Sequence, residues 1–179
     1  MAKIMNWTAA ISFLLTAVFT GFCLTGFDWA LPYAITFGAF FYHFAMRLLV
    51  GYILNCTMRN KADYTKAWYR LQSFEIRLYK TLKVKNWKGN MPTYDPNLFD
   101  PKLHSWDEIV QAMCQAEIVH EVIAVLSFLP LLAAIPFGSF GVFLITSALA
   151  ACYDLCFVIM QRYNRPRIIK LMSKERAAK

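Results

Sequence analysis

Four long runs of apolar residues dominate the chain, near residues 7–26, 30–54, 119–136 and 140–160. A helix needs about 20 apolar residues to cross the roughly 30 Å hydrocarbon core of a bilayer, and each run approaches that length. The first run has no small-x-small cleavage site, so we expect it to stay as a helix and not to be removed as a signal peptide. The pattern predicts an all-α integral membrane bundle of four transmembrane helices.

The segment between the second and third runs, residues 57–115, is polar but patterned. Its stretch YTKAWYRLQSFEIRLYKTL predicts an interfacial amphipathic helix, with basic residues off an apolar stripe formed by Tyr64, Trp68, Leu71, Leu78 and Leu82. Glu75 falls on that stripe, where a carboxylate is costly unless it has a partner or a task. The prolines and Asp/Asn turn formers that follow predict a surface loop before the third run.

The composition agrees with a membrane protein and not with a water-soluble domain, because 58% of the residues are hydrophobic and only 17% are charged. The net charge of +8 does not indicate nucleic-acid binding, since the basic residues flank the apolar runs. We therefore expect a single domain over residues 1–179 in the cell membrane, with both termini, the 57–115 segment and the basic tail 161–179 on the cytoplasmic side. The five cysteines form no CxxC pair and predict buried free thiols.

The third run is entered by a helix that starts at Ser105 as N-cap, with Glu108 at the capping-box position. Glu117 and His120 follow at i, i+3, so the carboxylate can hold the imidazole in one tautomer and support a general base. The alternative is an ordinary polar entry of a helix at the interface. A carboxylate-bridged metal pair would need the Glu-x-x-His motif twice, and it occurs once, so no metal is predicted.

Ionisable residues also lie inside two other runs. His43 and Arg47 share one helix face, either as a hydrogen-bonded histidine with a snorkelling arginine or as a cationic wall of a head-group pocket. Asp154 lies deep in the fourth run. A buried acid at that depth is expected to pair with an imidazole or a guanidinium, and His43 and Arg47 are the candidates.

The fourth run closes on QRYNRPR, residues 161–167, in which Pro166 is expected to bend or end the helix. Guanidinium groups bind phosphates in a bidentate fashion, so the motif predicts a site for a phosphate, pyrophosphate or sugar head group. Contact with anionic lipid would use the same residues. The candidate binding residues are Gln161, Arg162, Asn164, Arg165 and Arg167.

The stretches VKNWKGNMP (84–92), QAEIVH (115–120) and QRYNRPR together resemble the glycosyl-4,4'-diaponeurosporenoate acyltransferase family, membrane proteins that finish staphyloxanthin-type carotenoids. The resemblance covers about residues 70–170. It implies transfer of a fatty acyl group from a thioester donor to a hydroxyl on a lipid-linked sugar. The residues that match the pattern, besides the heptapeptide, are Glu75, Trp87, Lys88, Glu117 and His120.

On this reading His120, oriented by Glu117, takes the proton of the acceptor hydroxyl, Glu75 closes the site from below, and the arginines of the heptapeptide hold the phosphates of the donor. Acyl-CoA or an acyl-carrier thioester is expected as co-substrate, with no bound cofactor. Gln115 stands where the pattern has an arginine, and Glu121 where it has an aromatic residue, so we take the acceptor broadly as an amphiphilic lipid or glycolipid.

Two other functions are compatible with the same residues. The first is a small membrane reductase or methyltransferase that binds a nucleotide cofactor through the arginines of residues 161–167. The second is a lipid-binding or assembly subunit without activity. Among partners, membrane lipids and an amphiphilic acceptor are expected, nucleic acid is not, and a homo-oligomer is left open.

Overall fold

The computed structural model describes residues 2–178, so the two ends of the predicted domain, residues 1 and 179, lie outside it. It is 82% helix, and the described residues form no strand. The elements are α1 (Ala2–Leu24), η1 (Asp28–Ala30), α2 (Leu31–Met58), η2 (Ala67–Tyr69), α3 (Ser73–Thr81), α4 (Val84–Trp87), η3 (Lys88–Asn90), η4 (Pro96–Phe99), α5 (Trp106–Leu126), η5 (Leu129–Ala133), α6 (Ala134–Phe137) and α7 (Phe140–Ala178).

Four segments of the described chain are long and apolar enough to cross a membrane, which confirms the predicted fold class. They are Ala2–Leu24, Asp28–Met58, Trp106–Phe137 and Phe140–Glu175. Large apolar side chains, among them Trp7, Leu49 and Val125, are more than half exposed, as expected for helices whose outer faces contact lipid. The chain is a membrane protein, and the cytoplasmic placement of its termini stays a prediction.

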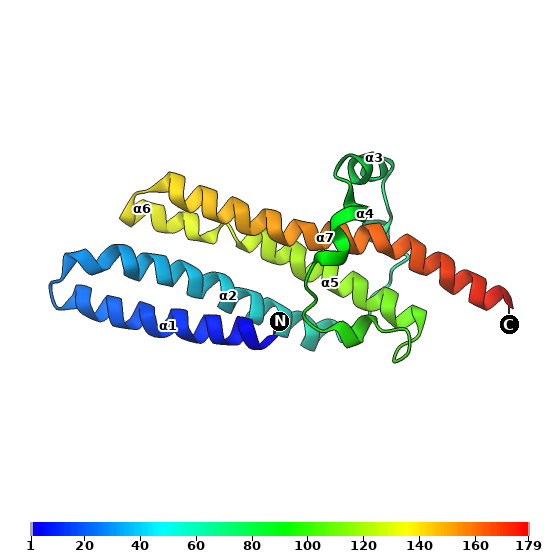
Figure 1. Cartoon of the computed structure of the whole chain (residues 1–179), viewed down its shortest axis with the longest axis horizontal. Coiled ribbons are helices and arrows are strands. Elements are labelled where there is room, and N and C mark those ends of the chain that lie inside the picture. The colour runs from blue at the N-terminus through cyan, green and yellow to red at the C-terminus, as the bar shows by residue number, and fades with distance from the viewer. Residues whose placement is uncertain (1, 179) are drawn as a thin grey trace.

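The four long helices form two hairpins that lie side by side (Figure 1). α1 packs against α2, and α5 packs against α7, while contacts between α2 and α5 join the hairpins. The turns of both hairpins lie at the same end of the molecule, and α3 and α4 lie beside α7 away from these turns. Gly26 and Gly138 supply the turns with positive φ angles of 93° and 69°, which cost glycine no steric strain.

The helix α5 begins where the sequence predicts. Ser105 accepts a hydrogen bond from the backbone N–H of Glu108, and the Glu108 side chain accepts one from the backbone N–H of Ser105. All five cysteines are free thiols, as predicted, but only Cys114 is buried; Cys23 and Cys156 are half-buried, and Cys56 and Cys152 are exposed.

The amphipathic helix expected from residue 64 onwards is shorter than predicted, because α3 comprises only Ser73–Thr81. Gln72 and Glu75 form a capping box that starts α3 at Ser73. Glu75 and Tyr79 are the buried residues of α3, whereas Leu78 is 41% exposed. Glu75, a member of the predicted stripe, is thus on the inward face, where its capping box and its ion pair with Arg162 fix the orientation of the helix.

Pro166 does not end α7, which continues to Ala178. Proline removes the single hydrogen bond to the carbonyl of the residue four positions earlier, here Arg162. The helix beyond it is held by packing, since Met172 is buried and its sulfur lies 4.0 Å from the hydroxyl of Tyr64. The side chains of the QRYNRPR stretch therefore follow helical spacing throughout.

Candidate active site

Two groups of buried and half-buried ionisable side chains lie between the helices. We call Glu75, Glu117, Arg162 and Arg165 the guanidinium cluster, and Arg47, His120 and Asp154 the histidine cluster. Glu117 is 0% exposed and Asp154 is 1% exposed, so each carboxylate has to be balanced within the protein.

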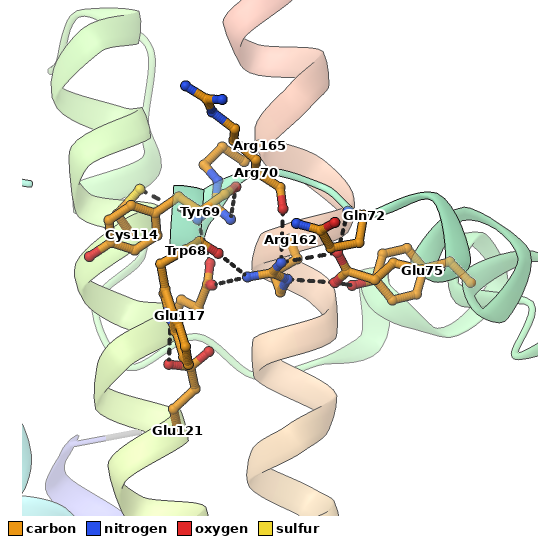
Figure 2. A network of polar contacts seen from close by, with 11 residues as sticks. Trp68, Tyr69, Arg70, Gln72, Glu75, Cys114, Glu117, Glu121, Arg162 and Arg165 are labelled. Atoms are coloured by element: carbon orange, nitrogen blue, oxygen red, sulfur yellow. Dashed lines mark hydrogen bonds and ion pairs between the residues drawn. The ribbon is translucent and has the colours of Figure 1, made fainter. Parts of the chain in front are cut away.

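Arg162 lies at the centre of the guanidinium cluster, between α5 and α3 (Figure 2). Its Nε donates to Glu75 Oε1 at 2.6 Å, and its Nη2 donates to Glu75 Oε2 at 3.0 Å. Its Nη1 donates to Glu117 Oε1 at 2.6 Å. Two backbone carbonyls, of Trp68 and Arg70, accept the remaining bonds at 2.8 and 3.1 Å. All five N–H donors of this guanidinium are thus used within the protein.

Arg165 is equally enclosed, with 2% of its surface exposed. Its Nη1 donates to Glu117 Oε2 and lies 3.4 Å from the sulfur of Cys114, while its Nη2 donates to the carbonyl of Tyr69 at 2.9 Å. The guanidinium also lies 5.2 Å from the centre of the Tyr69 ring. Two of the three arginines predicted to hold phosphates therefore bind carboxylates, and the prediction is corrected at Arg162 and Arg165.

Glu75 anchors α3 to this cluster. Burial by itself raises the pKa of Glu75, but hydrogen bonds from Arg162, from the backbone N–H of Gln72 and from the Tyr79 hydroxyl outweigh it and lower the pKa to about 2. The same contact acts on Tyr79, whose phenol pKa is raised by burial and by the Glu75 carboxylate. A carboxylate with this many donors stays ionised. The geometry thus places Glu75 as an anchor and not as a proton carrier.

The histidine cluster joins three helices. His120 Nδ1 on α5 lies 2.9 Å from Asp154 Oδ1 on α7. Arg47 on α2 donates from Nη2 to the other oxygen of Asp154 and from Nη1 to the carbonyl of His43 at 3.0 Å. Asp154 pairs with Arg47 as predicted, but its imidazole partner is His120 and not His43.

The predicted pairing of Glu117 with His120 is wrong. Both oxygens of Glu117 accept hydrogen bonds from Arg162 and Arg165, so this carboxylate does not orient the imidazole. Asp154 takes that role. The i, i+3 spacing on α5 shows that the two side chains share a helix face, but it carries no information about which partners the other helices bring.

His120 is held in a fixed orientation with one nitrogen left over. Its ring stacks on Phe157, with 4.4 Å between the ring centres and 7° between the planes. With Nδ1 donating to Asp154, Nε2 carries the lone pair, and it makes no hydrogen bond with a described residue. The side chain is 23% exposed. An imidazole with a carboxylate on one nitrogen and a free lone pair on the other is suited to general-base chemistry.

Three further predicted binding residues, Lys88, Asn164 and Arg167, lie with Tyr163 in a basic patch near the start of the tail, which we call the Tyr163 patch. Lys88 donates to Asn164 Oδ1 and lies 5.1 Å from the centre of the Tyr163 ring, while Arg167 lies 4.2 Å from it. Burial and the nearby Arg167 charge lower the pKa of Lys88. Neither cation forms an ion pair with a described carboxylate.

Two predicted residues stand apart from these contacts. Trp87 donates from its indole to the carbonyl of Leu82 at 3.0 Å, so it closes the turn after α3. Gln161 is buried in α7, next to Arg162. Glu121, a departure from the family pattern, accepts a hydrogen bond from the Trp68 indole at 3.0 Å. The sequence offered no signal for this last contact, because Trp68 was expected to lie on an interfacial stripe.

Comparison with known proteins gives one match. The sequence profile of the family described as glycosyl-4,4'-diaponeurosporenoate acyltransferase matches residues 65–174, more than half of the chain. The match contains Glu75, Glu117, His120, Asp154 and the QRYNRPR stretch, and it leaves out α1 and α2 with His43 and Arg47. No curated protein and no solved structure matches the chain.

Proposed function

Because the chain belongs to the glycosyl-4,4'-diaponeurosporenoate acyltransferase family and is thus an acyltransferase of the membrane, we propose that it moves a fatty acyl group from a thioester donor to a hydroxyl of a lipid or glycolipid, with His120 as general base. The observation that carries the proposal is the pairing of His120 with Asp154 at 2.9 Å, beside a guanidinium that balances the acid.

The proposed reaction is a direct transfer. His120 Nε2 takes the proton of the acceptor hydroxyl while the hydroxyl oxygen attacks the thioester carbonyl carbon. The tetrahedral intermediate then collapses, the carbon–sulfur bond breaks, and the imidazolium returns the proton to the leaving thiolate. Asp154 holds Nδ1–H throughout and stabilises the imidazolium. Atoms and charges balance without a covalent acyl-enzyme.

The donor's phosphates are best accommodated at the Tyr163 patch. Both Arg162 and Arg165 already form ion pairs with carboxylates, whereas Lys88 and Arg167 are cations without a described acidic partner. Along α7, Arg167 lies 13 residues beyond Asp154, which corresponds to about 20 Å at a rise of 1.5 Å per residue. An extended thioester donor can span such a distance between its charged end and its reacting carbonyl.

The same contacts weaken the nucleotide-cofactor alternative. That reading relied on the arginines of residues 161–167 as a common phosphate site, and two of the three are held by Glu75 and Glu117. Of the predicted phosphate site, only the Tyr163 patch on the helix surface remains.

The decisive experiment is acyl transfer by the purified protein in nanodiscs. Radiolabelled acyl-CoA is supplied with a total lipid extract from the native membrane, and the lipids are separated by chromatography. We compare the wild type with His120→Gln and with His104→Gln, a control in the loop before α5. A new labelled lipid from the wild type and the control, but not from His120→Gln, would support the proposal. Labelled product from all three proteins would remove His120 from the mechanism.

A further inference from the structure

An apolar groove lies between the two hairpins, in the half of the bundle that contains their turns. Its volume is about 440 Å³. Sites for small molecules have volumes of about 300–1,000 Å³, so the groove has the size of a ligand site. Its walls come from α1, α2, η5, α6 and α7, and the lining includes Leu31, Ala39, Tyr42, Ala133 and Phe143.

The groove suits a hydrocarbon chain. Its lining contains no charged residue, and all of its walls belong to segments that can span the membrane. On α2 it runs from Leu31 to Tyr42, which is about 16 Å along the helix axis and about half of a 30 Å hydrocarbon core. A head group with charges or hydroxyls would find few partners there.

At the end of the groove nearest the histidine cluster, the residues of α2 change from apolar to polar. Tyr42 lines the groove and donates from its hydroxyl to the carbonyl of Leu126 at 2.8 Å. The next residue, His43, has a buried Nδ1 that makes no hydrogen bond with any residue of 2–178. Buried polar atoms in native structures nearly always have a partner, so this nitrogen indicates a missing group.

The facing helix α7 shows the same change. Phe143 lines the groove, Ser147 follows four residues later, and Asp154 lies seven residues beyond that, all on one helix face. Ser147 is 0% exposed, and its Oγ likewise makes no hydrogen bond within the described chain. Two polar atoms without partners thus stand between the groove and the histidine cluster.

The order of features along α7 matches the order of parts in an acyl thioester. Phe143 marks the hydrocarbon groove, Asp154 marks the base, and Arg167 marks the cationic patch. The acyl chain is attached to the reacting carbonyl and points away from the donor's phosphates. If the phosphates lie beside Arg167 and the carbonyl beside His120, the chain extends toward Phe143.

We propose that the groove binds the hydrocarbon chain of the acyl group being transferred, with the chain passing His43 and Ser147 toward the carbonyl beside His120. The inference rests on the proposed acyl transfer and adds the site that selects the chain. It also assigns a role to the α1–α2 hairpin, which lies outside the family match over residues 65–174.

The test combines labelling with chain-length selectivity in nanodiscs. Palmitoyl-CoA with a diazirine at the end of its chain is photolysed with the protein, and the labelled residues are mapped by mass spectrometry. In a second measurement, kcat/KM is compared for palmitoyl-CoA and octanoyl-CoA. The groove is blocked by Ala39→Phe on α2 or by Ala133→Phe on the opposite wall. The control is Ala17→Phe, which places the same ring on an exposed position of α1. Its neighbour Thr16 lies beside Gly38, so the control lies at the depth of Ala39.

In the wild type and in Ala17→Phe, the label is expected on groove residues. Both blocking variants should lose that label and shift the preference toward octanoyl-CoA by about tenfold or more. Label spread over the exposed helix faces, or unchanged by either blocking variant, would overturn the inference. Labelling does not require turnover. Groove labelling without any transferred product would therefore refute the acyl transfer and leave the groove as a lipid-chain site, whereas product with unchanged selectivity would refute the groove alone.

Discussion

Arg162 on α7 donates to Glu117 on α5 at 2.6 Å, and the same guanidinium holds Glu75 of α3 through two further bonds. One side chain thus joins the second membrane hairpin to the segment that lies between the hairpins in sequence. Burying such charged groups costs free energy, and removing one of them costs more because its partner is left as an unpaired buried charge. These ion pairs hold the segment in place.

Replacing Glu117 with Gln should destabilise the protein by about 3–5 kcal/mol, because Arg165 is left as a buried cation without its carboxylate. The measurement is thermal unfolding in detergent, followed by circular dichroism. Glu121→Gln is the matched control, since its amide oxygen still accepts the bond from Trp68, and it should cost no more than about 1 kcal/mol. Equal losses in the two variants would argue against the guanidinium cluster as a main support of the fold.

Asp154→Asn should lower kcat by about 10²–10⁴-fold, because the imidazole loses the acid that fixes its tautomer and stabilises its charged form. The double variant with His120→Gln should be no slower than the slower single variant, since the two residues act as one unit. Additive losses in the double variant would show that Asp154 does not act through His120. Both variants are first compared with the wild type by size-exclusion chromatography to confirm that they fold.

The attachment of α3 to the guanidinium cluster should weaken at acidic pH. The pKa of Glu75 falls from an ordinary 4.5 to about 2 on folding, so its contribution to stability is complete above 4.5 and is lost as the pH falls from there to about 2. The contribution amounts to about 2–3 kcal/mol. Limited proteolysis of residues 59–105 at decreasing pH measures it. In Glu75→Gln the segment should be cleaved readily even at neutral pH, with little further change in this window.

Lys88→Ala and Arg167→Ala should each raise the KM for acyl-CoA by about tenfold with little change in kcat, because each removes a charged contact to the donor's phosphates and leaves the reacting groups in place. Lys85→Ala, an exposed lysine three residues earlier, should leave KM unchanged. A fall in kcat at constant KM would place the Tyr163 patch in the chemistry and not in donor binding.

Much of the fold follows from patterns that act locally. The apolar runs predict four membrane helices, and Ser105 with Glu108 predicts the start of α5. Where local pattern competes with tertiary contacts, the prediction fails. The helix predicted around Glu75 is reduced to Ser73–Thr81, with the carboxylate bound to Arg162, and α7 continues through Pro166 because packing compensates one lost hydrogen bond.

The site was predictable in its members but only in part in its pairs: the pair of Arg47 with Asp154 was predicted, and the pair of His120 with Asp154 was not. Ionisable residues in apolar runs single out Arg47, His120 and Asp154, since burial makes them costly unless they are paired. Which carboxylate pairs with which basic residue depends on how α2, α5 and α7 pack together. Glu117 is three residues from His120 in sequence, yet Asp154, 34 residues away, is its neighbour.

The ion pair between Arg47 and Asp154 has a consequence for the biogenesis of the protein. It joins α2 of the first hairpin to α7 of the second, so each hairpin enters the bilayer carrying a charge whose counter-ion is on the other. Glu117, Arg162 and Arg165, in contrast, are matched within the second hairpin itself. A hairpin on its own would hold a charge in the bilayer without its counter-ion, so the ion pair favours association of the two hairpins over their separation.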